Sequence, residues 1–220
     1  MSAAPAFHAD LPQVTEDSDL TGQVLREVPL PVTIQLANPL SDEGLLAFCQ
    51  ANSGLEIESD ADGSIRIMTP AGPESSELTQ LLATELSIWT RQSANGTVFG
   101  PDLGVRFADK VMRGPDVAWL SIERWNAYKQ SGTTRPAFLP FCPEFIVELR
   151  SPSDRASQIE AKMEFWMSRG AQLGWLIDSQ RKLAMIYRSN RESETLLQPE
   201  VLQGEGPIAG FLLKMQRFWE

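Results

Sequence analysis

The chain has 220 residues and carries 29 acidic side chains against 19 basic ones, which gives a formal net charge of −10. This length fits one large domain or one domain with appendages. Its hydrophobic content of 42% and charged content of 22% are ordinary for a globular protein, and the acidic balance argues against a basic nucleic-acid coat or a polybasic membrane binder.

The acidic charge is concentrated near the N-terminus. Residues 1–60 contain ten acidic residues and one basic residue, a net charge of −9. Residues 101–191 contain 14 basic and 10 acidic residues, a net charge of +4. A local basic groove in the body of the protein is therefore compatible with the composition.

Several classes of site are disfavoured by missing residues. The only histidine is His8, so a Ser-His-Asp or Cys-His mechanism and a histidine zinc site have little support. Cys49 and Cys142 form no CxxC pair, which predicts buried thiols and a cytoplasmic protein. The first residues lack the features of a signal peptide, no membrane span is expected because no apolar run approaches 18 residues, and no glycine-rich phosphate loop is present.

In chain order, residues 1–29 mix Ala, Pro, Asp and Glu without periodicity, which predicts a flexible acidic arm ahead of a single domain at 30–220. Residues 41–51 predict a short helix capped by Ser41. Period-two patterns at 55–59 and 64–68 flank Asp62-Gly63 and predict a hairpin.

The rest of the chain alternates helical and strand patterns. Helices are predicted at 74–93, 121–130 and 154–169, and strands at 97–100, 103–107, 116–120, 144–150, 173–178 and 182–188. The last two strands form a second hairpin. This order predicts an α/β fold with a mixed sheet, flanked by helices and extended by hairpins.

Two carboxylates stand out because each lies in an apolar strand. Asp116 follows Gly114-Pro115, and Glu148 lies two residues before Arg150, on the same strand face if the strand continues. One interpretation is a structural Glu148–Arg150 ion pair, with Asp116 capping a turn. The other is a divalent metal held by Asp116 and Glu148, with Arg150 facing an anion.

The segments GPDVAWLSIERWNA, PEFIVELRSPSD, KMEFW and LGWLID, in this order, resemble the Uma-two family of endonucleases. That family belongs to the restriction-endonuclease-like PD-(D/E)xK superfamily. The resemblance runs from about residue 40 to the C-terminus, and VELRSPSD is its most specific part. It implies a restriction-endonuclease-like core in which Pro115, Asp116 and Glu148 occupy motif positions.

Arg150 occupies the lysine position of the superfamily motif. Arginine cannot serve as a general base at ordinary pH, although it can stabilise charge on a phosphate. Lys162 is a candidate to share this role, because it lies beside the buried stripe of its helix; the alternative is a lysine that snorkels to water. Glu74, at the start of the 74–93 helix, resembles an additional metal ligand, or simply complements the helix dipole. Glu58 is a weaker candidate.

The resemblance therefore implies an Mg²⁺- or Mn²⁺-dependent endonuclease acting on DNA, as a homodimer. Asp116, Glu148 and the backbone carbonyl of Leu149 would hold the metal, with Arg150 and Lys162 as catalytic residues. The alternative is a catalytically silent binding or dimerisation module on the nuclease fold. A third hypothesis is that the acidic arm covers the site until a partner removes it.

Two further patterns bear on nucleic-acid binding. Arg155, Lys162 and Arg169 recur every seven residues, as a phosphate track or as a solvated charge stripe. Four tryptophans have apolar neighbours, which predicts core packing rather than base stacking; they are Trp119, Trp125, Trp166 and Trp175.

Overall fold

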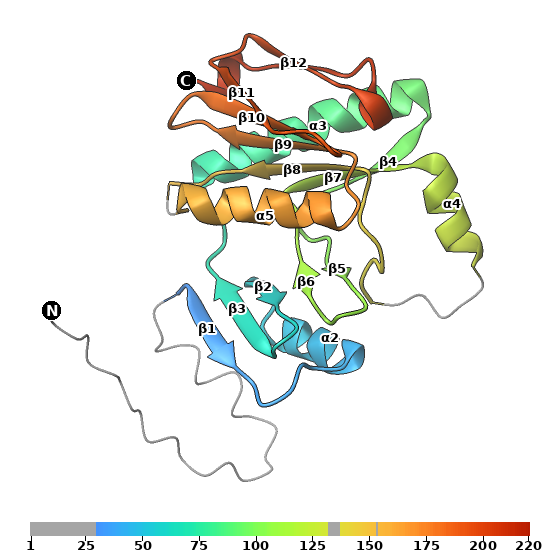
Figure 1. Ribbon diagram of the computed structural model, residues 1–220, viewed down its shortest axis with the longest axis vertical. Coiled ribbons are helices and arrows are strands. Elements are labelled where there is room, and N and C mark those ends of the chain that lie inside the picture. The colour runs from blue at the N-terminus through green and yellow to red at the C-terminus, as the bar shows by residue number, and fades with distance from the viewer. Residues whose placement is uncertain (1–29, 132–136, 153) are drawn as a thin grey trace, which may run out of the picture.

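The computed structural model describes residues 30–131, 137–152 and 154–220, and the predicted arm at 1–29 lies outside them (Figure 1). Its main element is a six-stranded sheet in the order β11-β10-β9-β8-β7-β4. The strands are β4 (Gly96–Phe99), β7 (Val117–Ser121), β8 (Phe145–Leu149), β9 (Leu173–Asp178), β10 (Leu183–Arg188) and β11 (Glu194–Leu197). Because β8 and β9 are parallel and the other pairs antiparallel, the predicted mixed sheet is confirmed.

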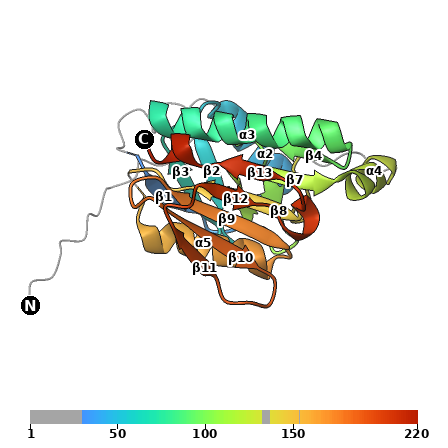
Figure 2. The same cartoon turned by 90° about the horizontal axis from the view of Figure 1, so that it is seen from above.

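Helices cover both faces of this sheet. Figure 1 shows α5 (Ala156–Ser168) in front and α3 (Pro73–Ser93) behind, and Figure 2 shows the sheet between them. Helix α5 is the crossover that two consecutive parallel strands require. The shorter α4 (Ile122–Gln130) follows β7 at the far end of the sheet.

The two faces of β8 pack against different elements. Phe145, Val147 and Leu149 join a buried apolar cluster that also contains residues of α3 and of the C-terminal hairpin, β12 (Val201–Gln203) and β13 (Leu212–Lys214). Ile146 joins a second cluster, formed with the inner face of α5. Since side chains alternate along a strand, Glu148 lies on the same face as Ile146, toward α5.

A smaller five-stranded sheet lies below α5 in Figure 1, in the order β1-β3-β2-β6-β5. Its elements are β1 (Val32–Gln35), β2 (Glu56–Ser59), β3 (Ser64–Met68), β5 (Val105–Arg106), β6 (Met112–Arg113) and the adjoining α2 (Asp42–Ala51). Ser59 pairs with Met112, only four residues before Asp116. This pairing brings β2, and with it Glu58, close to Asp116 at the start of β7.

The pattern predictions for regular elements are largely confirmed. Ser41 caps α2 by accepting a hydrogen bond from the Gly44 amide at 3.1 Å, and the predicted first hairpin is the β2–β3 pair. The 103–107 strand shortens to two residues in β5, and the patterns did not reveal β1, β6 or β11–β13. No helix in the described ranges is both long and apolar enough to cross a membrane.

Candidate active site

Asp116 and Glu148 lie together at one end of two neighbouring strands. Asp116 immediately precedes β7, and Glu148 is the penultimate residue of β8. Because β7 and β8 are antiparallel, with Val117 opposite Val147, the start of one strand lies beside the end of the other. The backbone N–H of Leu149 donates a hydrogen bond to Asp116 Oδ2 at 2.6 Å. This bond fixes the Asp116 carboxylate against the backbone next to Glu148.

Lys162 of α5 lies among these acidic groups. Its Nζ is 3.1 Å from Glu148 Oε2, 3.1 Å from Glu58 Oε1 and 2.7 Å from the Gly114 carbonyl oxygen, to which it donates a hydrogen bond. Glu148 and Glu58 are only 1% and 3% exposed. The ammonium group therefore links carboxylates from both sheets, in contrast to the snorkelling alternative, in which it would reach water.

The second oxygen of Glu148 contacts a tryptophan. Trp166 Nε1 donates a hydrogen bond to Glu148 Oε1 at 2.7 Å, and both residues are buried. Lys162 and Trp166 are four residues apart on α5, so both face the same strand. Trp166 was predicted to be a core aromatic residue, and its hydrogen bond to Glu148 was not predicted. Its four-residue spacing from Lys162 is the sequence feature that could have indicated this bond. Glu58 was underrated because only tertiary pairing brings β2 here.

Burial and charge crowding shift the titration of this cluster. Burial raises the pKa of Glu148 to about 8, with Asp116 and Glu58 adding to the rise and Lys162 opposing it. Burial also raises the pKa of Asp116. Burial would lower the pKa of Lys162, but the attraction of Glu148, Glu58 and Asp116 outweighs it, and the pKa is raised. The pKa of Glu56 is raised by burial and by the Asp116 charge. The crowded carboxylates of this cluster are thus stabilised by a positive charge beside them, which Lys162 supplies in part.

The donor chemistry fits a hard divalent cation. Asp116 and Glu148 supply carboxylate oxygens, and Mg²⁺ is commonly bound by one or two protein carboxylates, with waters and phosphate completing its coordination. Within the described residues, no three His, Cys, Asp or Glu side chains form a group that could hold a metal. Two carboxylates and the Leu149 carbonyl thus remain the predicted donor set.

Glu74 lies in the first turn of α3 and is exposed. In the part of the chain that the structure describes, it makes no hydrogen bond or ion pair with Asp116 or Glu148. Its role as an additional ligand stays a prediction.

Arg150 is held away from Glu148. Its NH1 pairs with Asp178 Oδ2 at 2.8 Å, and its Nε donates to the Asp154 carbonyl oxygen at 3.1 Å. The predicted Glu148–Arg150 ion pair is wrong, because β8 ends at Leu149 and Arg150 turns to the end of β9. Arg150 nevertheless stays at the same edge of the sheet as the carboxylates.

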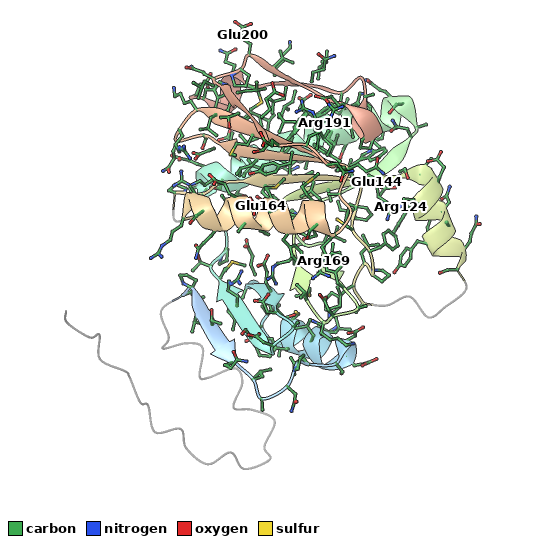
Figure 3. The ribbon with its side chains drawn as sticks, in the orientation of Figure 1. Arg124, Glu144, Glu164, Arg169, Arg191 and Glu200 are labelled. Atoms are coloured by element: carbon green, nitrogen blue, oxygen red, sulfur yellow. The ribbon has the colours of Figure 1, made fainter. Side chains whose placement is uncertain are left out.

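The heptad of basic residues does not form one solvent-facing stripe. Lys162 is engaged with Glu148, whereas Arg155 at the start of α5 is exposed. Arg169, labelled in Figure 3, pairs with Asp109 and lies over the rings of Phe107 and Phe165 at 5.0 and 4.9 Å. The same heptad spacing therefore leads to three different environments.

The opposite end of β8 has a second polar cluster. Glu144 accepts hydrogen bonds from the Ser121 amide at 3.1 Å and the Ser121 hydroxyl at 2.6 Å, and pairs with Arg124 NH1 at 3.1 Å (Figure 3). These contacts tie α4 to the sheet. In contrast to Glu148, Glu144 has no second carboxylate among its contacts in the described part of the chain.

Comparison with known proteins gives the family. The Uma2 model, described as "Putative restriction endonuclease", matches residues 42–216. The chain belongs to the Uma2 family. Its structure is similar to the "Crystal structure of a putative nuclease belonging to DUF820 from Anabaena variabilis ATCC 29413", with a TM-score of 0.65 and 17% sequence identity over 82% of this chain and 98% of that one. At this identity the likeness supports the shared fold. No curated protein matches the sequence.

The predicted restriction-endonuclease-like core is thus confirmed for this Uma2 protein.

Proposed function

We propose that this Uma2 protein is a metal-dependent endonuclease that hydrolyses DNA phosphodiester bonds at the Asp116–Glu148 site. The observation that carries the proposal is the meeting of two carboxylates from adjacent strands with the Lys162 ammonium group, at one edge of the central sheet. This combination suits metal-dependent hydrolysis, because the carboxylates can hold a divalent cation and the ammonium group can balance the negative charge that develops on the phosphate.

Each residue has a distinct role in the proposal. Asp116, Glu148 and the Leu149 carbonyl would hold Mg²⁺ or Mn²⁺. When bound, such an ion lowers the pKa of a water ligand and balances charge on the phosphate. Lys162, fixed at 3.1 Å from Glu148, adds a second positive charge beside the scissile group. Arg150, oriented by Asp178, would contact a neighbouring phosphate oxygen.

Exposed cations at the same edge would contact the DNA backbone. Arg155 lies at the start of α5, and Arg181 and Lys182 form the turn after β9. Arg181 NH1 is 4.0 Å from Glu160 of α5, so this turn lies close to the helix. Phosphate contacts from such residues supply sequence-independent affinity that falls with salt.

One observation favours the second candidate, a catalytically silent binding or dimerisation module. Lys162 already compensates Glu148 and Glu58, so the fold does not depend on a bound metal. Calorimetric titration with Mn²⁺ separates the two candidates, because a silent module gives no binding heat. Sedimentation of the protein with and without DNA tests the proposed homodimer.

The main test is nicking of supercoiled plasmid DNA with Mg²⁺ or Mn²⁺, and of RNA in parallel. We expect the wild type to cut and Asp116→Asn to lose at least about 100-fold in rate, the scale of one lost electrostatic contact to the transition state. Glu164→Gln is the matched control, because Glu164 is an exposed acid on α5 (Figure 3). Equal cutting by wild type and Asp116→Asn would reject the site.

A further inference from the structure

Trp166 is the one neutral donor on the Glu148 carboxylate among the described contacts. Its Nε1 lies 2.7 Å from Oε1, while Lys162 Nζ lies 3.1 Å from Oε2. The two donors are one helical turn apart on α5, so the helix presents them as a pair to the two oxygens of Glu148. The two Glu148 oxygens therefore have different partners, a neutral indole N–H at Oε1 and an ammonium group at Oε2.

We infer that Trp166 is a positioning residue that holds Glu148 Oε1 and so directs Oε2 toward Lys162, where a metal ion would share that oxygen, an inference that rests on the proposed function. An indole N–H donates but never accepts and does not titrate at ordinary pH, so it keeps one carboxylate oxygen engaged whatever the charge of its neighbours. Partners that orient a metal-binding carboxylate in this way tune metal affinity.

The helix that carries the indole packs closely on the sheet. A Cβ atom built on Gly174 of β9 would lie 2.3 Å from Met163 Cε, so the glycine leaves room for the Met163 side chain where α5 packs on the sheet. Trp166 follows Met163 by three residues and is fully buried. Met163 and Trp166 therefore pack α5 against the sheet beside Glu148.

Other buried tryptophans show that core packing here does not require a paired indole. Trp175 of β9 is fully buried, and Trp119 of β7 is 2% exposed. Neither of their Nε1 atoms has a hydrogen-bond partner among the described residues. The bond from Trp166 to Glu148 is thus a specific feature of this end of the sheet.

The test compares Trp166→Phe with Trp175→Phe. Both changes replace a fully buried indole by a phenyl ring, but only the first removes a hydrogen bond to Glu148. By calorimetry, we expect Trp166→Phe to weaken Mn²⁺ binding by about 10- to 100-fold, the usual effect of losing such a partner. We expect Trp175→Phe to stay within about threefold of the wild type.

A second measurement uses the wild type alone, so it does not depend on either variant folding. In a ¹H–¹⁵N spectrum, the Trp166 indole signal is assigned through its proximity to the Phe165 ring, whose centroid lies 5.6 Å from that of Trp166. Addition of Mg²⁺ should shift this signal and leave that of Trp175 unchanged. A shift of neither signal on saturation with Mg²⁺ would overturn the inference.

The outcomes separate this inference from the proposed function. If the wild type binds Mn²⁺ and Trp166→Phe binds it equally well, the positioning role is overturned and the endonuclease proposal stands. Equal losses of Mn²⁺ affinity in Trp166→Phe and Trp175→Phe would show that the effect comes from packing. That result would also overturn the positioning role. If the wild type binds no Mn²⁺, the proposed function fails, and the inference fails with it.

Discussion

The two faces of the central sheet differ in what they bury, although the same strands form both. Toward α3, β8 presents Phe145, Val147 and Leu149 to an apolar cluster. Toward α5, it presents Ile146 and then Glu148. One oxygen of Glu148 pairs with Lys162, and the other accepts a hydrogen bond from Trp166. Alternation along one strand thus separates an apolar face from the face that carries the proposed site.

The aromatic contacts on the α3 face explain its stabilising role. Trp175 meets Phe145 edge-on, with ring centroids 5.0 Å apart, and stacks on Phe211 at 5.9 Å. Such pairs add to the large apolar area that aromatic residues bury. The ion cluster on the α5 face gives little net stability, because desolvation offsets much of the attraction between its charges. This difference agrees with the proposed role of Glu148 in chemistry rather than in stability.

The largest expected effect comes from breaking the α3 face. Phe145→Ala removes a fully buried ring from the contact with Trp175. We expect it to lower the free energy of unfolding by about 3–5 kcal/mol, the usual cost of a large cavity. Urea denaturation measures this loss. The folded fraction should still bind Mn²⁺ normally, and a large loss of Mn²⁺ affinity would contradict the separation of the faces.

An intermediate effect is expected from Lys162→Met on the α5 face. The change leaves Glu148 and Glu58 buried without their shared ammonium group. Removal of one partner of a buried ion pair costs about 3–5 kcal/mol, and we expect about 2 here, because the Lys162 side chain is 20% exposed. Urea denaturation again measures the loss.

The double variant Lys162→Met/Glu148→Gln sharpens this comparison. It should recover part of the lost stability, because it also removes a buried negative charge. Lys182→Met, an exposed lysine in the turn after β9, is the matched control and should change stability little. Additive effects of the two changes would show that Lys162 and Glu148 are energetically independent.

The smallest expected effect is a pH dependence of the metal-free protein. Burial raises the pKa of Glu148 from 4.5 to about 8. The folded state therefore keeps a proton that the unfolded chain releases, and this contribution to stability is lost as pH rises from about 4.5 to 8. We expect an effect smaller than that of Lys162→Met, because relaxation and water penetration reduce the real cost of ionising a buried carboxylate.

Urea denaturation in EDTA at several pH values measures this dependence. Glu148→Gln cannot titrate, so its stability should fall less over the same interval than that of the wild type. Parallel curves for the two proteins would mean that Glu148 does not titrate differently in the folded state.

Sequence patterns predicted the strands and helices that carry Asp116, Glu148 and Lys162, because each lies in a local pattern of clear period. They failed for Arg150, whose expected position beside Glu148 assumed one more residue of strand. They also underrated Glu58, since nothing near it in the chain shows that β2 pairs with β6. The seven-residue spacing of Arg155 and Arg169 around Lys162 suggested a common face that the structure does not have.

The sequence by itself determined the α/β class, the family resemblance and the pair of acidic residues, because these depend on local periodicity and on motif residues. Tertiary structure alone decided that Lys162 lies between Glu148 and Glu58, and that Trp166 occupies the other Glu148 oxygen. The physical reason is that these contacts join separate elements. Their geometry depends on how α5 packs on β8 and on how the smaller sheet pairs beside it.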